Sequence, residues 1–446
     1  MKSTLHRSST LTLAIAGIWA ACTPLAQAQN LVELYQSARA FDANYLSARL
    51  QYDANVARAE QARAGILPTS SMTANANMTD QSSTLGTTLS RAFESQTATI
   101  TATQPLYRPS NWISYEQSKK QVDVAQAVLN TAEQELIVRT SQTYFDVLAS
   151  QDSLTFVKAQ KEAVAEQLAS AKRNFEVGTA TITDTREAQA RFDLVLAQEI
   201  AAENDLRVKK IALDQLVGKT GTAPRGLAAP LVLPPVVPAE VNAWVTQSEG
   251  AHPSIRQAQN NLEIARLEVT KAEAGHKPTL DLTANYNTAR NPSGTATSDR
   301  SFRANSTVIG LALNVPLFSG FSTQNRIREA LLLSDKAQSD LDGARRTVAQ
   351  ATRTAFFGVL SGQGQVKALE AAELSSQSAL EANRLGYQVG VRINIDVLNS
   401  QSQLFQTKRD LAKARYDVLV GGLRLRQASG TLKPEDLQPI NTLLVK

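Results

Sequence analysis

The feature that most constrains the fold is a sharp reversal inside a long helix-forming run, and it occurs twice. The run from 317 to 432 contains no proline, so proline does not interrupt a helix there. Gly390 can adopt the positive φ that ends a helix, and the short or β-branched residues at 391–395 suit a turn. A second proline-free run, 110–223, contains a similar stretch at Gly178. The sequence therefore predicts two long helical hairpins, each with a tight tip.

A constant offset of 212 residues relates the two tips, which indicates an internal duplication. The first tip reads RNFEVGTATITDTREAQ and the second reads NRLGYQVGVRINIDVLNSQ. The matching pairs include Gly178 with Gly390 and Asp184 with Asp396. Between the hairpins, Gly218 to Pro238 is rich in proline and glycine and is interpreted as a connector. We expect one repeat over 29–240 and a second, with a C-terminal tail, over 241–446.

Residues 1–28 carry the features of a secretory signal peptide. Basic residues precede an apolar run at 11–21, and Ala26-Gln27-Ala28 fits a small-x-small cleavage site. The apolar run is shorter than a membrane-spanning helix requires. Cys22 is the only cysteine, and cleavage directly before it, followed by lipidation, stays an open alternative. In both cases the sequence predicts an exported chain.

Four segments alternate between apolar and polar residues, as strands with one apolar face do. The alternating segments are 72–78, 97–103, 280–286 and 308–315. The polar stretches between the members of each pair, 79–96 and 287–305, are expected to be loops. The sequence thus predicts two β-hairpins with strands of about eight residues, a length that crosses a bilayer when the strand is tilted.

The helix lengths fit one another. The outgoing helix of the first hairpin is predicted from about Trp112 to Glu176, which is roughly 100 Å at 1.5 Å per residue. The return helix to Leu216 and an N-terminal helix over Asn30–Ile66 are each about half as long. Placed end to end, these two match the outgoing helix and produce a wall of uniform height.

Four strands per chain are too few to close a barrel. Open strand edges in lipid leave unpaired backbone groups that cost several kcal/mol each. Strands that lie in a membrane must therefore be shared among several chains, and three chains supply twelve strands, an even number in the usual range. The predicted fold class is an α+β membrane protein. It combines a long antiparallel α-helical coiled-coil barrel with four β-strands per chain that contribute to a shared 12-stranded trimeric outer-membrane β-barrel.

The order and spacing of these motifs resemble the TolC family of outer-membrane efflux and type I secretion channels. The resemblance rests on both tip motifs and on QPLYRP and NVPLFSGF, where strands lead into helices, and it covers the chain after the leader. It implies a homotrimer in the lipid of the outer membrane of a Gram-negative bacterium, with a helical portion in the periplasm. The implied partners are a periplasmic adaptor (membrane fusion) protein and an inner-membrane transporter, either ABC or proton-driven.

The resemblance also implies roles for residues at the tips. The expected periplasmic entrance latch consists of Thr183 and Asp184 at the first tip and Tyr387 and Arg392 at the second. Contacts from arginine and tyrosine to a carboxylate suit a latch, because each is modest when solvated and three subunits repeat it. The alternative is that these are ordinary solvated tip residues.

A further expectation concerns an acidic ring. By resemblance, Asp396 lines the pore, where three copies form a ring of carboxylates. The family often has a second acidic ring one helical turn on, at a position where this chain has Asn399. This departure weakens the expectation of strong block by multivalent cations, while Asp396 is still expected to favour cations.

The sequence argues against an enzyme. After the leader the histidines are His252 and His276, and no Cys/His cluster is present for a metal. The stretch from Gly218 to Thr220 lacks the glycine that a phosphate-binding loop needs at 213. We therefore expect no catalytic residue, metal or cofactor. The net charge of +5 is weak and its sign alternates along the chain, so no nucleic-acid partner is expected.

Two matters stay open at the level of sequence. A structural coiled-coil protein of the envelope, without transport activity, is the alternative function, and the two membrane-length hairpins argue against it. The cargo, either secreted proteins or small molecules, leaves no feature in the sequence.

Overall fold

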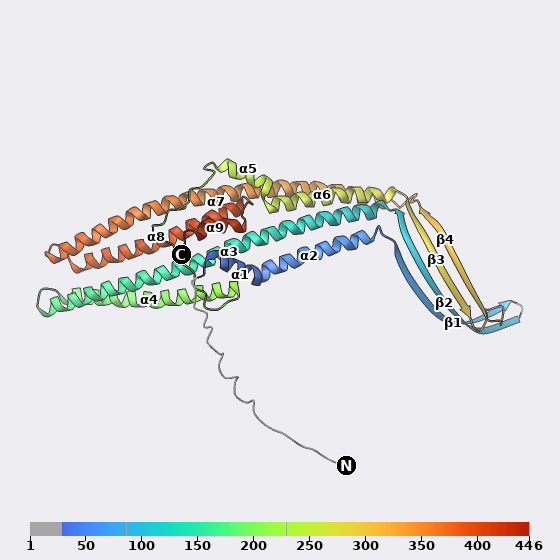
Figure 1. Cartoon of the computed structure of the whole chain (residues 1–446), viewed down its shortest axis with the longest axis horizontal. Helices are drawn as coiled ribbons and strands as arrows, with labels where there is room; N and C mark the ends of the chain where they lie inside the picture. Colours follow the sequence, from blue (N-terminus) through green and yellow to red (C-terminus); the bar gives the residue numbers. More distant parts are fainter. Residues whose placement is uncertain (1–28, 86, 229, 446) are drawn as a thin grey trace, which may run out of the picture.

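The computed structural model describes residues 29–85, 87–228 and 230–445, and it has a long helical body with a sheet bent away from one end (Figure 1). The predicted leader at 1–28, including Cys22, lies outside the described residues.

The same order of elements occurs twice. The first half contains α1 (Leu31–Phe41), α2 (Ala43–Ala64), β1 (Thr69–Leu85), β2 (Thr87–Tyr107), α3 (Pro109–Glu176) and α4 (Ile182–Val217). The second contains α5 (Val241–Ala251), α6 (Pro253–Glu273), η1 (Ala274–His276), β3 (Thr279–Asn291), β4 (Phe302–Asn314), α7 (Ser322–Gln388) and α8 (Asn394–Ala428). The tail contains η2 (Pro434–Asp436) and α9 (Leu437–Asn441).

The long helices have the predicted lengths. α3 contains 68 residues and α7 contains 67, so each is roughly 100 Å long. α4 and α2 both pack along α3, while α8 and α6 both pack along α7 (Figure 1). α1 contacts α4 where the shorter helices of the first half meet. The end-to-end arrangement inferred from helix lengths is therefore confirmed.

The N-terminal helix differs from the prediction, because it breaks at Asp42. This residue has extended backbone angles (φ −62°, ψ 119°), and its Oδ1 accepts a hydrogen bond of 2.8 Å from the Tyr45 amide. Its Oδ2 accepts another, of 2.6 Å, from Arg139 on α3. An aspartate that caps the following helix competes with the helical backbone, so one continuous helix over 30–66 was wrong.

The sheet is an antiparallel meander in the order β1-β2-β3-β4, so β2 and β3 join the two halves of the chain. The strands have 17, 21, 13 and 13 residues, well beyond the predicted eight. Most of the stretches expected to be loops are strand: Thr79 pairs with Phe93, and Asn287 with Ser306. The prediction failed because backbone pairing continues where both faces are polar and apolar alternation has ended.

The register confirms that the sheet has one apolar and one polar face. Residues directly opposite one another in antiparallel strands share a face. Met72, Ile100 and Tyr286 form one apolar row across three strands. The neighbouring row on the other face reads Thr73, Thr99 and Asn287.

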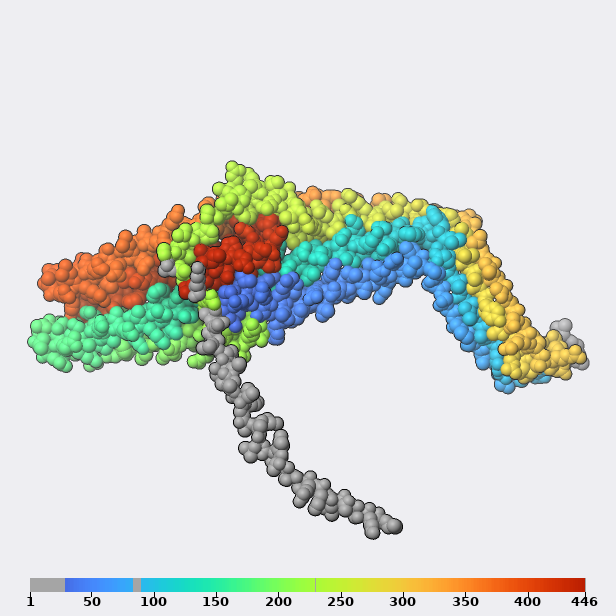
Figure 2. All heavy atoms as spheres, in the orientation of Figure 1, coloured from blue at the N-terminus to red at the C-terminus, as the bar shows by residue number. Residues whose placement is uncertain are grey.

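Aromatic packing fills the middle of the helical body. Phe145 contacts Tyr144 and Tyr416, with ring centroids 5.4 and 5.5 Å apart. Residues of α1 and α9 close this cluster, and Figure 2 shows the C-terminal residues (red) lying against α1 (blue) at mid-length. The largest core therefore lies where the connector, the tail and both hairpins meet.

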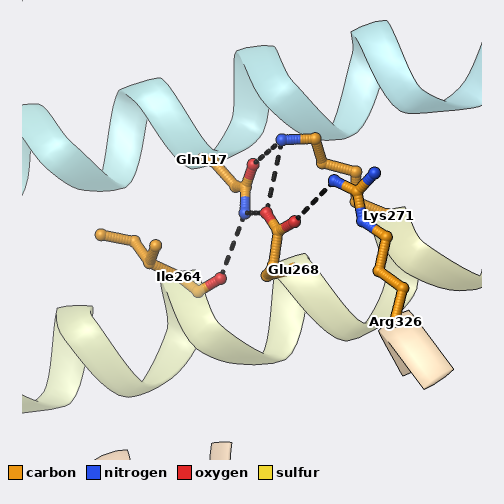
Figure 3. A network of polar contacts seen from close by, with 5 residues as sticks. All are labelled: Gln117, Ile264, Glu268, Lys271 and Arg326. Atoms are coloured by element: carbon orange, nitrogen blue, oxygen red, sulfur yellow. Dashed lines mark hydrogen bonds and ion pairs between the residues drawn. The ribbon is translucent and has the colours of Figure 1, made fainter. Parts of the chain in front are cut away.

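A polar network joins three helices near the strand end of the body (Figure 3). Glu268 of α6 accepts hydrogen bonds from Gln117 of α3 (2.8 Å), from Lys271 (3.3 Å) and from Arg326 of α7 (3.4 Å). Burial by itself raises the pKa of Glu268, but the Gln117 hydrogen bond, the Lys271 charge and the remaining hydrogen bonds outweigh it, so the pKa is lowered. This network holds α6 between the two long helices.

Candidate functional site at the helical tips

The two tips have one turn geometry. At each tip, two consecutive backbone amides that follow the long helix donate to one carbonyl in its last turn, that of Asn174 in α3 and that of Gly386 in α7. Gly178 and Gly390 each have a φ of 79°, the left-handed conformation that ends a helix and that glycine adopts without strain from a Cβ atom. The pairing of the tips inferred from the sequence thus extends to the backbone.

The return helices begin differently at the two tips. Thr181 is the N-cap of α4: its Oγ1 accepts from the Asp184 amide at 3.2 Å, and the Asp184 carboxylate accepts from the Thr181 amide at 2.9 Å. This capping box holds the Asp184 carboxylate within its own helix. The N-cap of α8 is Ile393, which supplies no side-chain acceptor.

Within one chain, the four expected latch residues do not meet one another. Arg392 lies in the turn before α8, and its Nη1 is 3.7 Å from Oδ2 of Asp396 in the first turn of α8. The Tyr387 hydroxyl accepts a hydrogen bond of 3.3 Å from Asn174 Nδ2 across the two hairpins. Thr183 is exposed, and its side chain makes no hydrogen bond to any residue that the structure describes.

A buried asparagine, which sequence reasoning missed, connects the hairpins. Asn394 is fully buried; its Nδ2 donates to the Asp184 carbonyl at 3.3 Å, and its Oδ1 accepts from Gln167 of α3. Leu398, one turn further, is fully buried among apolar residues of α3 and α4. The signal available in the sequence was a polar residue between Ile393 and Ile395.

The two expected ring positions lie one helical turn apart on α8. Asp396 is partly exposed and Asn399 is exposed. Asn399 Oδ1 accepts a hydrogen bond of 2.7 Å from Arg191 of α4, a contact that the sequence did not predict. The second ring position is therefore bonded to a cation of the same chain.

No helix within 29–85, 87–228 or 230–445 is both long and apolar enough to span a membrane. Over the same ranges, no three His, Cys, Asp or Glu side chains gather as metal ligands would.

Comparison with protein families gives a match over both halves of the chain. The family model described as "Outer membrane efflux protein" matches residues 34–219 and 244–431. The matched segments contain both tips and the contacts between them.

Similar proteins are known in several bacteria. The chain is 34% identical to "Outer membrane protein TolC" of Vibrio cholerae over 416 residues, which is 93% of each chain. It is 29% identical to "Proteases secretion protein PrtF" of Dickeya chrysanthemi, over 93% of this chain and 91% of that protein. The solved structure of CusC superposes with a TM-score of 0.80 at 17% identity, covering 90% of this chain and 92% of the other, which shows a shared fold.

Proposed function

The chain belongs to the outer membrane efflux protein family, and from this premise we propose how it builds and gates a channel. It is a non-enzymatic efflux and secretion channel of the TolC type in the outer membrane of a Gram-negative bacterium. Membership of the family implies a trimer that works with efflux pump partners.

The sheet of a single chain is open, with β1 at one edge and β4 at the other, and this supports assembly of several chains into one barrel. β1 and β4 each have one paired edge and one free edge in the single chain. The outer strand β4 exposes Ile309, Leu311 and Leu313 on one face. Free edges in lipid are costly, so three chains join β4 to β1 of the next copy and close twelve strands around a pore.

The helical body forms the tunnel below that barrel. The tips lie at the end of the body opposite the sheet (Figure 1), which suits contact with proteins across the periplasm. We assign as partners a periplasmic adaptor (membrane fusion) protein and an inner-membrane transporter, either ABC or proton-driven. The cargo comprises proteins, small molecules or both; a named protease secretion protein among the relatives supports the first.

The chain divides into repeats at 29–240 and 241–446, after a leader at 1–28. The repeated order of elements and the matching backbone of the two tips support this division. So does the match of the family model as two separate segments.

At the entrance, Thr183, Asp184, Tyr387 and Arg392 act as a latch when hairpins of neighbouring copies meet. The hydrogen bonds from Asn174 to Tyr387 and from Asn394 to the Asp184 carbonyl hold the hairpins of one chain together. Opening of the entrance has to separate the second hairpin from the first. The Arg392 guanidinium, weakly paired with Asp396 at 3.7 Å, is free to exchange onto another carboxylate.

Single-channel conductance of the purified trimer in planar bilayers tests the function and the latch. Arg392→Ser and Tyr387→Phe should each raise conductance, and the double variant should raise it further, because each removes a contact that keeps the entrance narrow. Asp184→Ala also removes one of the two hydrogen bonds of the capping box of α4, at a cost of up to about 1 kcal/mol, so Asp184→Asn, which keeps an acceptor there, is the sharper variant.

The matched control is Arg384→Ser, which removes a cation from α7, close to Tyr387, at an exposed position without a described side-chain contact. Its conductance should equal that of the wild type. Intact trimers with unaltered conductance in every latch variant would show that these residues do not gate the entrance. Intact trimers that conduct no ions at all would contradict the proposal that the assembled chains form a channel.

A further inference from the structure

A polar cavity of about 410 Å³ lies between α3, α4 and α8. It begins at Arg191, nine residues into α4, which is roughly 14 Å from the first tip. Its lining contains two arginines, several amides and a serine, and no aspartate or glutamate. The polar lining side chains include Gln160, Arg191, Gln198, Asn399, Ser402 and Arg409.

The two arginines of this cavity have no carboxylate partner. Arg191 donates to Asn399 and Arg409 donates to Gln406 Oε1, each at 2.7 Å, and neither forms an ion pair within the described part of the chain. Burial lowers the pKa of Arg409, against the opposing charge of the adjacent Asp410. A partly desolvated guanidinium with no carboxylate at ion-pair distance attracts an anion strongly.

Three polar atoms of the same cavity are buried without a partner. They are Gln160 Oε1, Gln198 Oε1 and Ser402 Oγ, and the Gln160 residue is only 3% exposed. A buried polar atom without a hydrogen bond costs about 1–3 kcal/mol. Because the two amide oxygens are acceptors, an occupant that satisfies them must supply hydrogen-bond donors.

We propose that this cavity binds a small hydroxylated anion of the hydroxy-carboxylate class. Its carboxylate groups lie between Arg191 and Arg409, and its hydroxyl donates to Gln160. Such a ligand bridges α4 and α8, which belong to different hairpins, and therefore favours the arrangement in which the hairpins lie together. The site is formed within one chain, so the proposal does not depend on the latch.

Calorimetric titration of the detergent-solubilised protein with citrate tests the site, at an ionic strength held constant with chloride. Citrate should bind saturably with one site per chain. Arg191→Gln and Arg409→Gln should each weaken binding at least tenfold. Arg207→Gln is the matched control, because it removes an exposed arginine of α4 that does not line this cavity, and citrate affinity should not change.

Tricarballylate tests the hydroxyl, because it has the three carboxylates of citrate and lacks the hydroxyl group. It should bind at least threefold more weakly than citrate to the wild type. The difference should disappear in Gln160→Met, which keeps the shape of the side chain without the acceptor. If that variant does not fold, the affinities of the wild type for citrate and tricarballylate still show whether the hydroxyl group contributes to binding.

Three results would overturn the proposal: no saturable binding of citrate, which would leave the cavity to water; equal weakening in the Arg207→Gln control; or equal affinity for both anions. Gel filtration of each variant before titration ensures that loss of binding is not loss of the folded protein.

Discussion

At the scale of single residues, burial controls the charge of Asp152 in the middle of the body. Burial raises its pKa, and the hydrogen bond of 2.6 Å from the Tyr416 hydroxyl offsets this only in part. A carboxyl whose pKa is higher in the folded state contributes stability that is fully present below its unfolded pKa of about 3.9. That contribution is lost as the pH rises through the folded pKa.

We therefore expect Asp152→Asn to gain stability relative to the wild type as the pH rises from 4 to 8. The melting temperature of the two proteins, measured side by side across this range, checks the sign. An exposed carboxylate, Asp340, provides the control substitution Asp340→Asn. A difference in melting temperature that falls with pH, or that the control reproduces, would contradict the assignment.

A second residue-scale prediction concerns the ring at Asp396. Three carboxylates around a narrow pore focus a negative potential, so Asp396→Ala should reduce cation preference and any block by trivalent cations. Asn399→Asp should strengthen the block only slightly, because the new carboxylate lies next to Arg191. The double variant Asn399→Asp with Arg191→Gln should be blocked more strongly than Asn399→Asp alone, because the new carboxylate then has no guanidinium beside it. Reversal potentials in a salt gradient measure the cation preference, and titrations with trivalent cations measure the block. If both quantities are unchanged in Asp396→Ala, then Asp396 does not line the pore.

The tip motifs could be predicted residue by residue, but their partners could not. The 212-residue offset placed Gly178 and Gly390 in equivalent turns, since a turn is encoded by adjacent residues. Arg191 and Asn399 are 208 positions apart in sequence, and Gln167 and Asn394 are 227 apart. Contacts of this kind depend on how one hairpin lies on the other, which no local pattern encodes.

At the scale of elements, the chain uses left-handed glycines in two kinds of turn. Gly178 and Gly390 end α3 and α7 in open space, with no atom near an added Cβ. Gly430, after α8, has a φ of 72°, and a Cβ there would lie 2.3 Å from the His252 Cα. A substitution by alanine therefore introduces only backbone strain at Gly178 and Gly390. At Gly430 it introduces the same strain and also a clash with the backbone of His252.

Alanine substitution should separate the two kinds of turn. Gly178→Ala and Gly390→Ala should each cost about 1–2 kcal/mol, the strain of a left-handed residue with a Cβ. Gly430→Ala should cost clearly more, because the backbone of the α5–α6 junction has to move. Chemical denaturation of the solubilised protein provides the comparison. Equal losses at all three positions would show that the contact at Gly430 is not rigid.

Helices were easier to predict than strands, for a physical reason. No proline occurs in α3 after its first residue or anywhere in α7, so the proline-free runs of the sequence indicated how long these two helices could be. Strand pairing relies on backbone groups and continues beyond the apolar band, so the outer parts of β1 and β2 carry no alternation to detect. The break at Asp42 was hidden for a similar reason: its cap is a single side chain within a helical pattern.

At the scale of the whole molecule, the single chain exposes what an assembly would cover. The two edges of the sheet are different strands, β1 and β4, so copies joined edge to edge form a head-to-tail contact, which leaves no free edge only when it closes into a ring. The number of strands in the sequence indicated that several chains share one barrel. The sequence could not indicate the bend between sheet and body, where Arg108 donates hydrogen bonds of 2.8 and 2.5 Å to Asp281 of β3.

Engineered cysteines can test ring closure directly. Ser71 of β1 lies in the same row of the polar face as Val308 of β4, and Gly310, Ala312 and Asn314 continue that face along β4. A fixed Ser71→Cys, combined in turn with a cysteine at each of these four β4 positions, scans the register of the joint. The native cysteine lies outside the described chain, in the predicted leader, and is replaced by serine in every variant.

One or two adjacent pairs should form disulfides between copies, because a bridge requires Cα atoms about 4.4–6.8 Å apart. Non-reducing gels should then show covalently closed trimers, with no ladder beyond three copies, since a ring of three uses up both edges. The matched control, Ser71→Cys with Leu311→Cys, places the second thiol on the apolar face and should remain uncrosslinked. Open-ended ladders would mean that the contact does not close, and monomers in every pair would mean that β1 and β4 do not meet.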